Sequence, residues 1–165
     1  MIVHPAIPQP SDTATNRLWN IFAPIAAAAP QVVYVMMSDA YRLDRWAADS
    51  RSEDVYPGVF LMRPRYVGTL DMQAEFEVVF YVLVWGSLAL HQDADAAYNE
   101  QDAAYHQAEI IVTNIIQSLV HLGYEAKINY DKRYNIEPII YQEVDSVWGY
   151  EVKLRFGIPA NDLIC

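Results

Sequence analysis

One stretch of this sequence gathers side chains that could bind a metal ion. His91, Asp93 and Asp95 lie close together, and His106 and Glu109 follow at i, i+3 spacing, which would place both on one face of a helix. Imidazole and carboxylate groups are suitable ligands, but the sequence has no His-Glu-x-x-His motif. The stretch also lacks the glycine and the closing glutamate of a calcium loop. We therefore interpret it as the solvated, acidic start of a helix and predict no metal site.

The remaining candidates for catalysis lack their usual partners. Ser87 follows Trp-Gly without the Gly-x-Ser-x-Gly elbow of a nucleophile, and the six glycines form neither a phosphate loop nor a dinucleotide-binding motif. Glu75 and Glu77 share one face of a predicted strand and could act as paired carboxylates, but acids at the end of a strand usually face water. His4 and His121 have no chemical partner nearby in the sequence. We predict no catalytic and no cofactor-binding residues, and a protein that is not an enzyme.

The charge balance limits the partners of the chain. Its 165 residues carry a formal charge of -10, from 21 acidic and 11 basic residues, which disfavours general binding to nucleic-acid phosphates. The basic strings around Arg63 and Arg65, and at Lys132 and Arg133, are better explained as ion-pair partners for a neighbouring acidic copy than as phosphate contacts. Cys165 is the one cysteine, which excludes an intramolecular disulfide and a thiolate zinc site.

Length and composition predict one folded domain that buries surface against other chains. Residues 11–165 fit a single domain, and residues 1–10, with three prolines and no basic cluster, are typical of an extended arm. Only 19% of the residues are charged, and the twelve tyrosines suit interfaces that are apolar at the centre and wet at the rim. No apolar run reaches the roughly 20 residues needed to cross a bilayer, so we expect no membrane contact.

Two apolar stripes at helical spacing predict the main helices. The first covers residues 14–29, after N-cap candidates at residues 11–13, and contains Pro24, which could kink it. The second covers residues 93–122: it starts among acids, continues through apolar residues in steps of three and four, and is predicted to stop at Gly123. A short helix with local ion pairs is predicted over residues 38–48.

Alternating patterns predict the strands, at residues 56–62, 74–90, 124–131, 136–141 and 148–156. The last strand alternates apolar and polar residues without interruption from Trp148 to Phe156, and Pro138 interrupts the fourth. This succession predicts an α+β fold. It would consist of an antiparallel sheet of about 4–5 strands with one long helix packed on a face of the sheet, and an N-terminal helix.

Three strings within these strands resemble a known family. They are YPGVFLMRP at residues 56–64, FEVVFYVL at residues 76–83 and PIIYQEVDSVWGYEV at residues 138–152. The first two resemble the strand entrance and the following long strand of tail-completion or tail-terminator proteins of long-tailed bacteriophages. The third resembles the acid-containing turn and the aromatic-glycine pair that precede the last strand of these proteins. The resemblance spans residues 11–158.

This resemblance implies a virion structural protein without catalytic residues. Such proteins form a homo-oligomeric ring, commonly a hexamer, at the head-proximal end of the tail. They contact the tail tube and the neck or connector proteins, and DNA passes through the lumen without specific binding. The expected location is the tail or neck of the virion, and the host cytoplasm during assembly. The alternatives are a head-tail connector, a tube component, or a small hydrolase or ligand-binding domain with a pocket between the long helix and the sheet.

Overall fold

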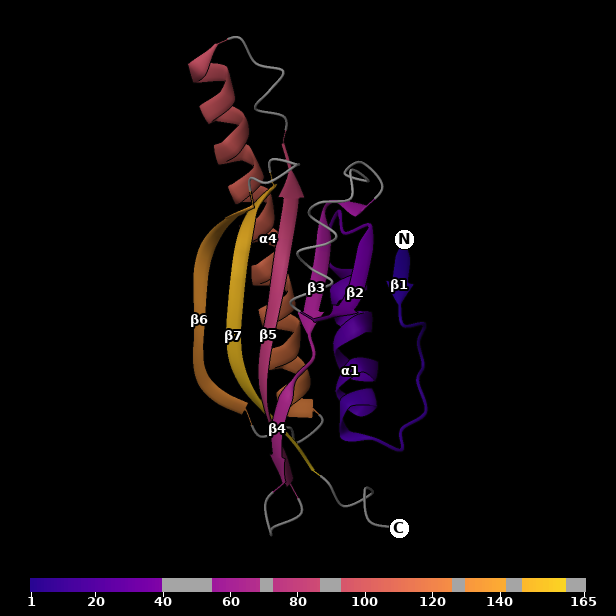
Figure 1. The fold of residues 1–165 in the computed structure, drawn as a ribbon. Coiled ribbons are helices and arrows are strands. Elements are labelled where there is room, and N and C mark those ends of the chain that lie inside the picture. The colour runs from indigo at the N-terminus through magenta and orange to yellow at the C-terminus, as the bar shows by residue number, and fades with distance from the viewer. Residues whose placement is uncertain (40–54, 69–72, 87–92, 126–129, 142–146, 160–165) are drawn as a thin grey trace.

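The computed structural model describes residues 1–39, 55–68, 73–86, 93–125, 130–141 and 147–159. In these ranges seven strands form one sheet, and the helices α1 and α4 pack side by side on one face of it (Figure 1). The predicted α+β fold, with one long helix on the sheet and an N-terminal helix, is confirmed in outline. The prediction of 4–5 antiparallel strands is wrong, because the sheet has more strands and is mixed.

The strands follow the order β1-β2-β3-β5-β7-β6, and β4 pairs with β5 on the side of β3. β2 runs parallel to both β1 and β3. The other pairs are antiparallel: β5 pairs with β3, β4 and β7, and β7 pairs with β6. β5 and β7 are paired over their full length of 13 residues each and form the centre of the sheet. The strands are β1 (Ile2–His4), β2 (Tyr34–Ser38), β3 (Gly58–Met62), β4 (Arg65–Gly68), β5 (Gln73–Trp85), β6 (Tyr130–Tyr141) and β7 (Val147–Pro159).

Two strands of the parallel part of the sheet, β1 and β2, are not among the predicted strands. β2 is buried at every position, so it has a continuous apolar run instead of an alternation, as is typical of a strand covered on both faces. The short helix predicted over residues 38–48 is wrong at its first residue, because Ser38 ends β2. The remainder of that prediction, from residue 40, lies outside the described residues.

The helix α1 (Ala14–Ala28) matches the first predicted helix. Its N-cap is Thr13, whose Oγ1 accepts a hydrogen bond from the backbone N–H of Asn16 at 3.2 Å. Pro24 lies inside the helix at an exposed position, away from the packed face. The predicted helix and its cap are confirmed.

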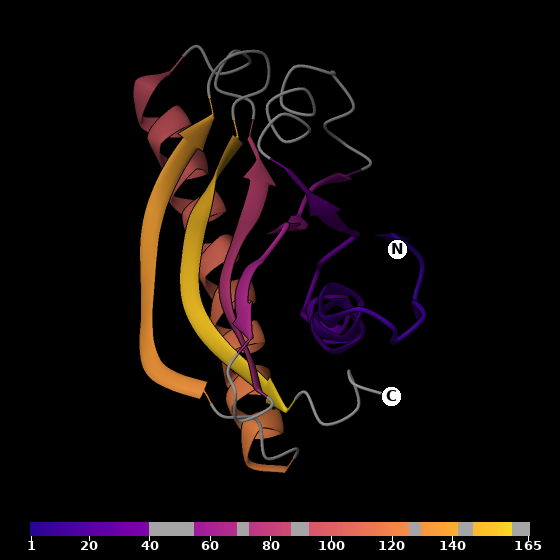
Figure 2. The ribbon, with the colours of Figure 1, turned by 60° about the horizontal axis from the view of Figure 1, so that its bottom comes forward.

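Residues 1–10 lie along α1 and end in contact with its first turns (Figure 2). The indole Nε1 of the fully buried Trp19 donates a hydrogen bond to the Pro5 carbonyl at 3.0 Å. Gln9 and Asn20 are joined by two hydrogen bonds of 2.7 Å each, between the backbone of the first and the side-chain amide of the second. These contacts hold β1 beside β2 at the edge of the sheet.

The helix α4 (Ala94–Glu125) spans 32 residues, or roughly 48 Å. Its apolar stripe is buried from Ala104 to Leu119, as predicted. The predicted stop at Gly123 is wrong, because the helix continues to Glu125, so residues 124–125 are helical and do not begin a strand. Packing of the stripe against the sheet stabilises the last turn more than a single glycine destabilises it.

Two other strand boundaries differ from the prediction. β6 is one continuous strand over Tyr130–Tyr141, where two strands, at residues 124–131 and 136–141, were predicted, the second interrupted by Pro138. Because β6 lies at the edge of the sheet, a proline without an N–H can be accommodated there. β5 ends at Trp85 and not at residue 90 as predicted.

The main hydrophobic core lies between the two helices and the sheet. Trp19 and Phe22 of α1, Ile115 of α4, Phe80 of β5 and Trp148 of β7 are each at most 1% exposed. The ring centroids of Phe22 and Phe80 are 5.2 Å apart. The core therefore fixes both helices and the central strands as one unit.

The opposite face of the sheet, called the far face below, has two parts. Near the end of β5 it is covered by a second cluster of buried residues that includes Tyr34, Phe60 and Leu83. Near the start of β5 the far face carries exposed charged side chains, beginning with Glu75. This face of β5 therefore begins charged and becomes apolar toward Trp85, and its apolar end is covered within the chain.

Candidate interaction surfaces

The structure separates the residues that the sequence suggested as metal ligands. Asp93 accepts a hydrogen bond from the backbone N–H of Asp95 at 3.1 Å and so acts at the start of α4. His106 and Glu109 are exposed farther along the helix, and His91 lies outside the described residues. Among the residues that the structure describes, no group of three or more His, Cys, Asp or Glu side chains could hold a metal ion.

The other candidate residues are dispersed over the molecule. Glu75 and Glu77 share the far face of β5 and are exposed, as predicted. His4 lies on β1, and His121 is exposed near the carboxyl end of α4. Two further residues singled out from the sequence, Ser87 and Cys165, lie outside the described ranges.

Polar side chains join three strands across the middle of the far face. The Tyr81 hydroxyl on β5 donates a hydrogen bond to Glu151 on β7. Lys153 Nζ lies 2.6 Å from Glu151 Oε1 and 4.0 Å from Glu137 Oε2 on β6. Glu137 and Glu151 are directly opposite each other in the ladder, so Lys153 offsets a like-charge pair that would otherwise be destabilising.

The pKa of Glu151 reports this environment. Partial burial is the largest single effect and would raise the pKa of the carboxyl, but the hydrogen bonds from Lys153 and Tyr81 and the charge of Lys153 together lower it below its usual value. The hydrogen bond to Glu151, and then its charge, raise the pKa of the Lys153 ammonium. Both groups are therefore charged at neutral pH, and they act as a structural joint between strands.

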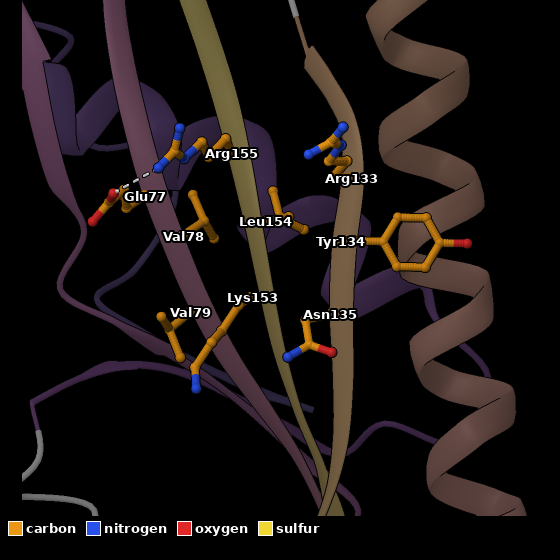
Figure 3. Close-up of a pocket in the computed structure, with 9 residues that line it drawn as sticks. All are labelled: Glu77, Val78, Val79, Arg133, Tyr134, Asn135, Lys153, Leu154 and Arg155. Carbon is orange, nitrogen blue, oxygen red and sulfur yellow. Dashed lines mark ion pairs between the residues drawn. The ribbon is translucent and has the colours of Figure 1, made fainter.

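Nearer the start of β5, arginines from three strands form a row across the far face. Arg65 of β4 stands opposite Glu77 of β5, and Glu77 stands opposite Arg155 of β7, with Arg155 Nη2 3.5 Å from Glu77 Oε1. A bulge in β6 sets residues 131–133 opposite Arg155 alone, which brings Arg133 into the same row (Figure 3). We call Arg65, Arg155 and Arg133 the arginine row.

Arg65 and Arg133 belong to separate basic strings in the sequence, and Arg155 lies in the alternating pattern of the last strand. The sequence does not show that they form a row, because the row depends on the register between segments that are far apart in the chain. The one available signal was the strict alternation of both long strands, which fixes the face of each residue but not its cross-strand neighbour.

Two members of the arginine row, Arg133 and Arg155, line a groove of about 550 Å³ on the far face. This volume lies in the range of roughly 300–1,000 Å³ that is usual for binding pockets. Glu77 and Lys153 also line it, and Lys153 is ion-paired with Glu151 on the same face (Figure 3). The two arginines against Glu77 make this part of the wall positive in a chain with a formal charge of -10.

The first turns of α4 have the opposite character. Residues 93–103 include no buried side chain, because this part of the helix extends past the ends of the strands (Figure 1). Tyr98 is 64% exposed there. We call residues 93–103 the α4 tip; it has no lysine or arginine, and its acids are Asp93, Asp95, Glu100 and Asp102.

Exposed apolar side chains gather at two opposite edges of the sheet. On β4, Tyr66 is 52% and Val67 is 68% exposed, and on β6, Tyr134 and Ile140 are each 48% exposed. β4 and β6 lie on opposite sides of the central strands β5 and β7 (Figure 1). We call these two regions the β4 edge and the β6 edge.

The β6 edge is attached to α4 by tyrosines. The Tyr105 hydroxyl donates a hydrogen bond of 3.4 Å to the Ile139 carbonyl, and its ring meets the Tyr150 ring edge-on at 5.7 Å. Burial raises the pKa of Tyr105, although a hydrogen bond with Gln101 lowers it slightly. The pKa of Tyr150 is raised by burial first, and then by the charges of Glu109 and Tyr105. Both hydroxyls stay protonated at neutral pH, and the Tyr105 hydroxyl joins α4 to the β6 edge.

Among the described residues, neither helix is both long and apolar enough to cross a membrane. A scan against protein-family models and a search of curated proteins each found no match to this chain. The surfaces described above and the three sequence strings are therefore the basis for a functional assignment.

Proposed function

We propose that this protein is a virion structural protein that forms a ring, a hexamer, at the head-proximal end of a phage tail. There it ends the tail tube and meets the neck, and DNA passes through its lumen. The observation that carries this proposal is the pair of unlike edges with exposed apolar side chains. When the β6 edge of one copy joins the β4 edge of the next, each copy keeps one edge for a further copy, and such a contact closes into a ring if the rotation between copies permits.

The positions of the three resembling strings support the proposal. The first leads into β3, the second forms the buried part of β5, and the third contains Trp148 and Gly149 at the start of β7. The resemblance therefore concerns the antiparallel centre of the sheet, from which both edges extend. None of the three strings lies in the arm or in β2.

The charge of α4 also supports a role around DNA. The helix carries acids along its length and, over 32 residues, contains no lysine or arginine. A wall of this composition repels phosphates and would let DNA move without being held. A helix of this kind suits the wall of a channel for DNA.

The alternatives differ in how well the structure supports them. A head-tail connector or a tube component would use the same two edges, and only the place of the ring in the tail separates these roles. A hydrolase or ligand-binding domain with a pocket between α4 and the sheet has less support, because Ala108, Val112 and Ile115 fill that space and are 0% exposed.

Replacement of Ile140 by aspartate tests the proposal at the β6 edge. We expect light scattering to give a particle of about six copies for the native chain and smaller species for Ile140→Asp, because a charge would be buried in the contact between copies. The matched control is Ile110→Asp on α4, which has a similar exposure of 43% but lies away from both edges. Native protein that remains monomeric at high concentration, or equal assembly of both variants, would contradict the proposal.

A further inference from the structure

We propose that the arginine row of one copy binds the acidic α4 tip of a second copy. This inference rests on the proposed self-assembly and adds to it the contact that orients one copy against the next. The groove beside the row would receive side chains of the tip, and the guanidinium groups would meet its carboxylates.

Arg155, at the centre of the arginine row, can exchange its carboxylate partner at small cost. The ion pair between Arg155 and Glu77 spans 3.5 Å between side chains that are 70% and 61% exposed. Exposed pairs of this kind contribute about 0–1 kcal/mol. An incoming carboxylate that excludes water from the groove would interact more strongly, and arginine can bind it with two parallel hydrogen bonds.

The α4 tip is the segment of this chain that best fits the row. It places four acids and no lysine or arginine within residues 93–103. None of its side chains is buried in its own copy, so these turns of α4 gain little from packing, which supplies most helical stability in proteins. A second copy that covers the tip would therefore stabilise its helical turns and bury part of Tyr98.

The contact has to join two copies, because the two surfaces lie at opposite ends of one molecule. The arginine row crosses β5 at Glu77, near the start of that strand, whereas the tip extends beyond the other end of the sheet (Figure 1). The buried stripe that begins at Ala104 fixes the direction of the helix and prevents the tip from folding back. The surfaces are unlike, so the contact is head to tail, as a ring requires.

A protein partner is favoured over nucleic acid by the overall charge of the chain. Its formal charge of -10 repels a phosphate backbone, which carries negative charge along its whole length. The tip brings only four carboxylates, which the three arginines of the row can meet.

Charge reversal of each surface, alone and combined, tests the inference. The row variant is Arg65→Glu with Arg155→Glu, and the tip variant is Asp95→Arg with Asp102→Arg. Each alone should weaken self-association at least about tenfold in sedimentation velocity, because like charges would then face each other. An equimolar mixture of the two variants, and a chain that carries all four changes, should both associate within about threefold of the native protein.

Two controls separate this contact from other effects. Gln117→Glu and Asp12→Arg change the charge at exposed positions outside both surfaces and should leave association unchanged. Ring formation that is equal in all variants would overturn the inference and leave the proposed function standing, whereas a native chain that never associates would end both. Salt-sensitive binding of labelled DNA by the native chain that is lost in the row variant would also overturn it.

Discussion

Replacement of Gly149 by alanine should destabilise the fold, although alanine is normally the better residue inside a strand. Gly149 lies at the start of β7 opposite Leu83 of β5. A Cβ at this position would lie 1.8 Å from the Val82 carbonyl oxygen and 2.9 Å from the Val82 carbonyl carbon. The close approach of two backbones is a reason for glycine in the aromatic-glycine pair of the third resembling string.

The loss of stability can be estimated from the distance by which the two backbones would have to separate. Ordinary contact begins at 3.4 Å, so the oxygen and the new carbon would have to separate by about 1.6 Å. The obstructing atom belongs to the backbone of β5, which is held on one side by β3 and on the other by β7. Overpacking of this kind costs about 1–3 kcal/mol. For a chain of this length that corresponds to a Tm lower by roughly 2–12 °C.

Thermal unfolding followed by circular dichroism, at one fixed protein concentration, measures this effect. The control on the same strand is Arg155→Ala, which removes an exposed ion pair and should cost less than about 1 kcal/mol. The sign of the shift is decisive, because without the close approach alanine would stabilise the strand by about 0.5–1 kcal/mol. A Gly149→Ala protein with an unchanged or higher Tm would refute the reasoning.

Three further predictions concern the contacts between strands, the packing of α4 on the sheet and the attachment of the arm. The pKa of Glu151 is lowered in the folded protein, so its contribution to stability is complete above its unfolded pKa of about 4.5 and is lost as the pH falls through the folded pKa. The difference in Tm between the native protein and Glu151→Gln should therefore be largest near neutral pH and shrink in acid. A Tm difference that does not change with pH would contradict this. Ile115→Ala should lower the free energy of unfolding, measured in urea, by about 2–5 kcal/mol, because Ile115 is fully buried. The control Thr113→Ala, at an exposed position of the same helix, should lower it by less than about 0.5 kcal/mol. Equal losses of stability would argue against the packing of α4 on the sheet. Trp19→Phe removes the donor to the Pro5 carbonyl and should speed proteolysis of the arm in limited digestion, whereas unchanged cleavage would show that this bond does not hold the arm.

The sequence was sufficient for elements whose pattern is set by one buried face. The stripe of α4 and the alternation from Trp148 to Arg155 each face the core on one side and water on the other, so their periods identify them. β2 is covered on both faces and has no such period, and β1 is too short to show one. The parallel part of the sheet was therefore not predictable from local patterns.

The candidate interaction surfaces depend on tertiary structure even more than the parallel strands do. The residue types at Arg65 and Arg155 were evident, but only the register that sets both beside Glu77 turns them into a row. The β4 and β6 edges likewise follow from strand order, which no local pattern encodes. The acidic start of α4 was predicted from its sequence, and its extension past the sheet was not, because strand lengths decide where the core ends.

Electron microscopy of the purified native chain at physiological salt can show directly whether it forms rings. We expect closed rings of about six copies with an open centre, in which each copy presents one edge of its sheet to the opposite edge of the next. A population of single copies, or of two-fold dimers in which both partners use the same edge, would contradict it.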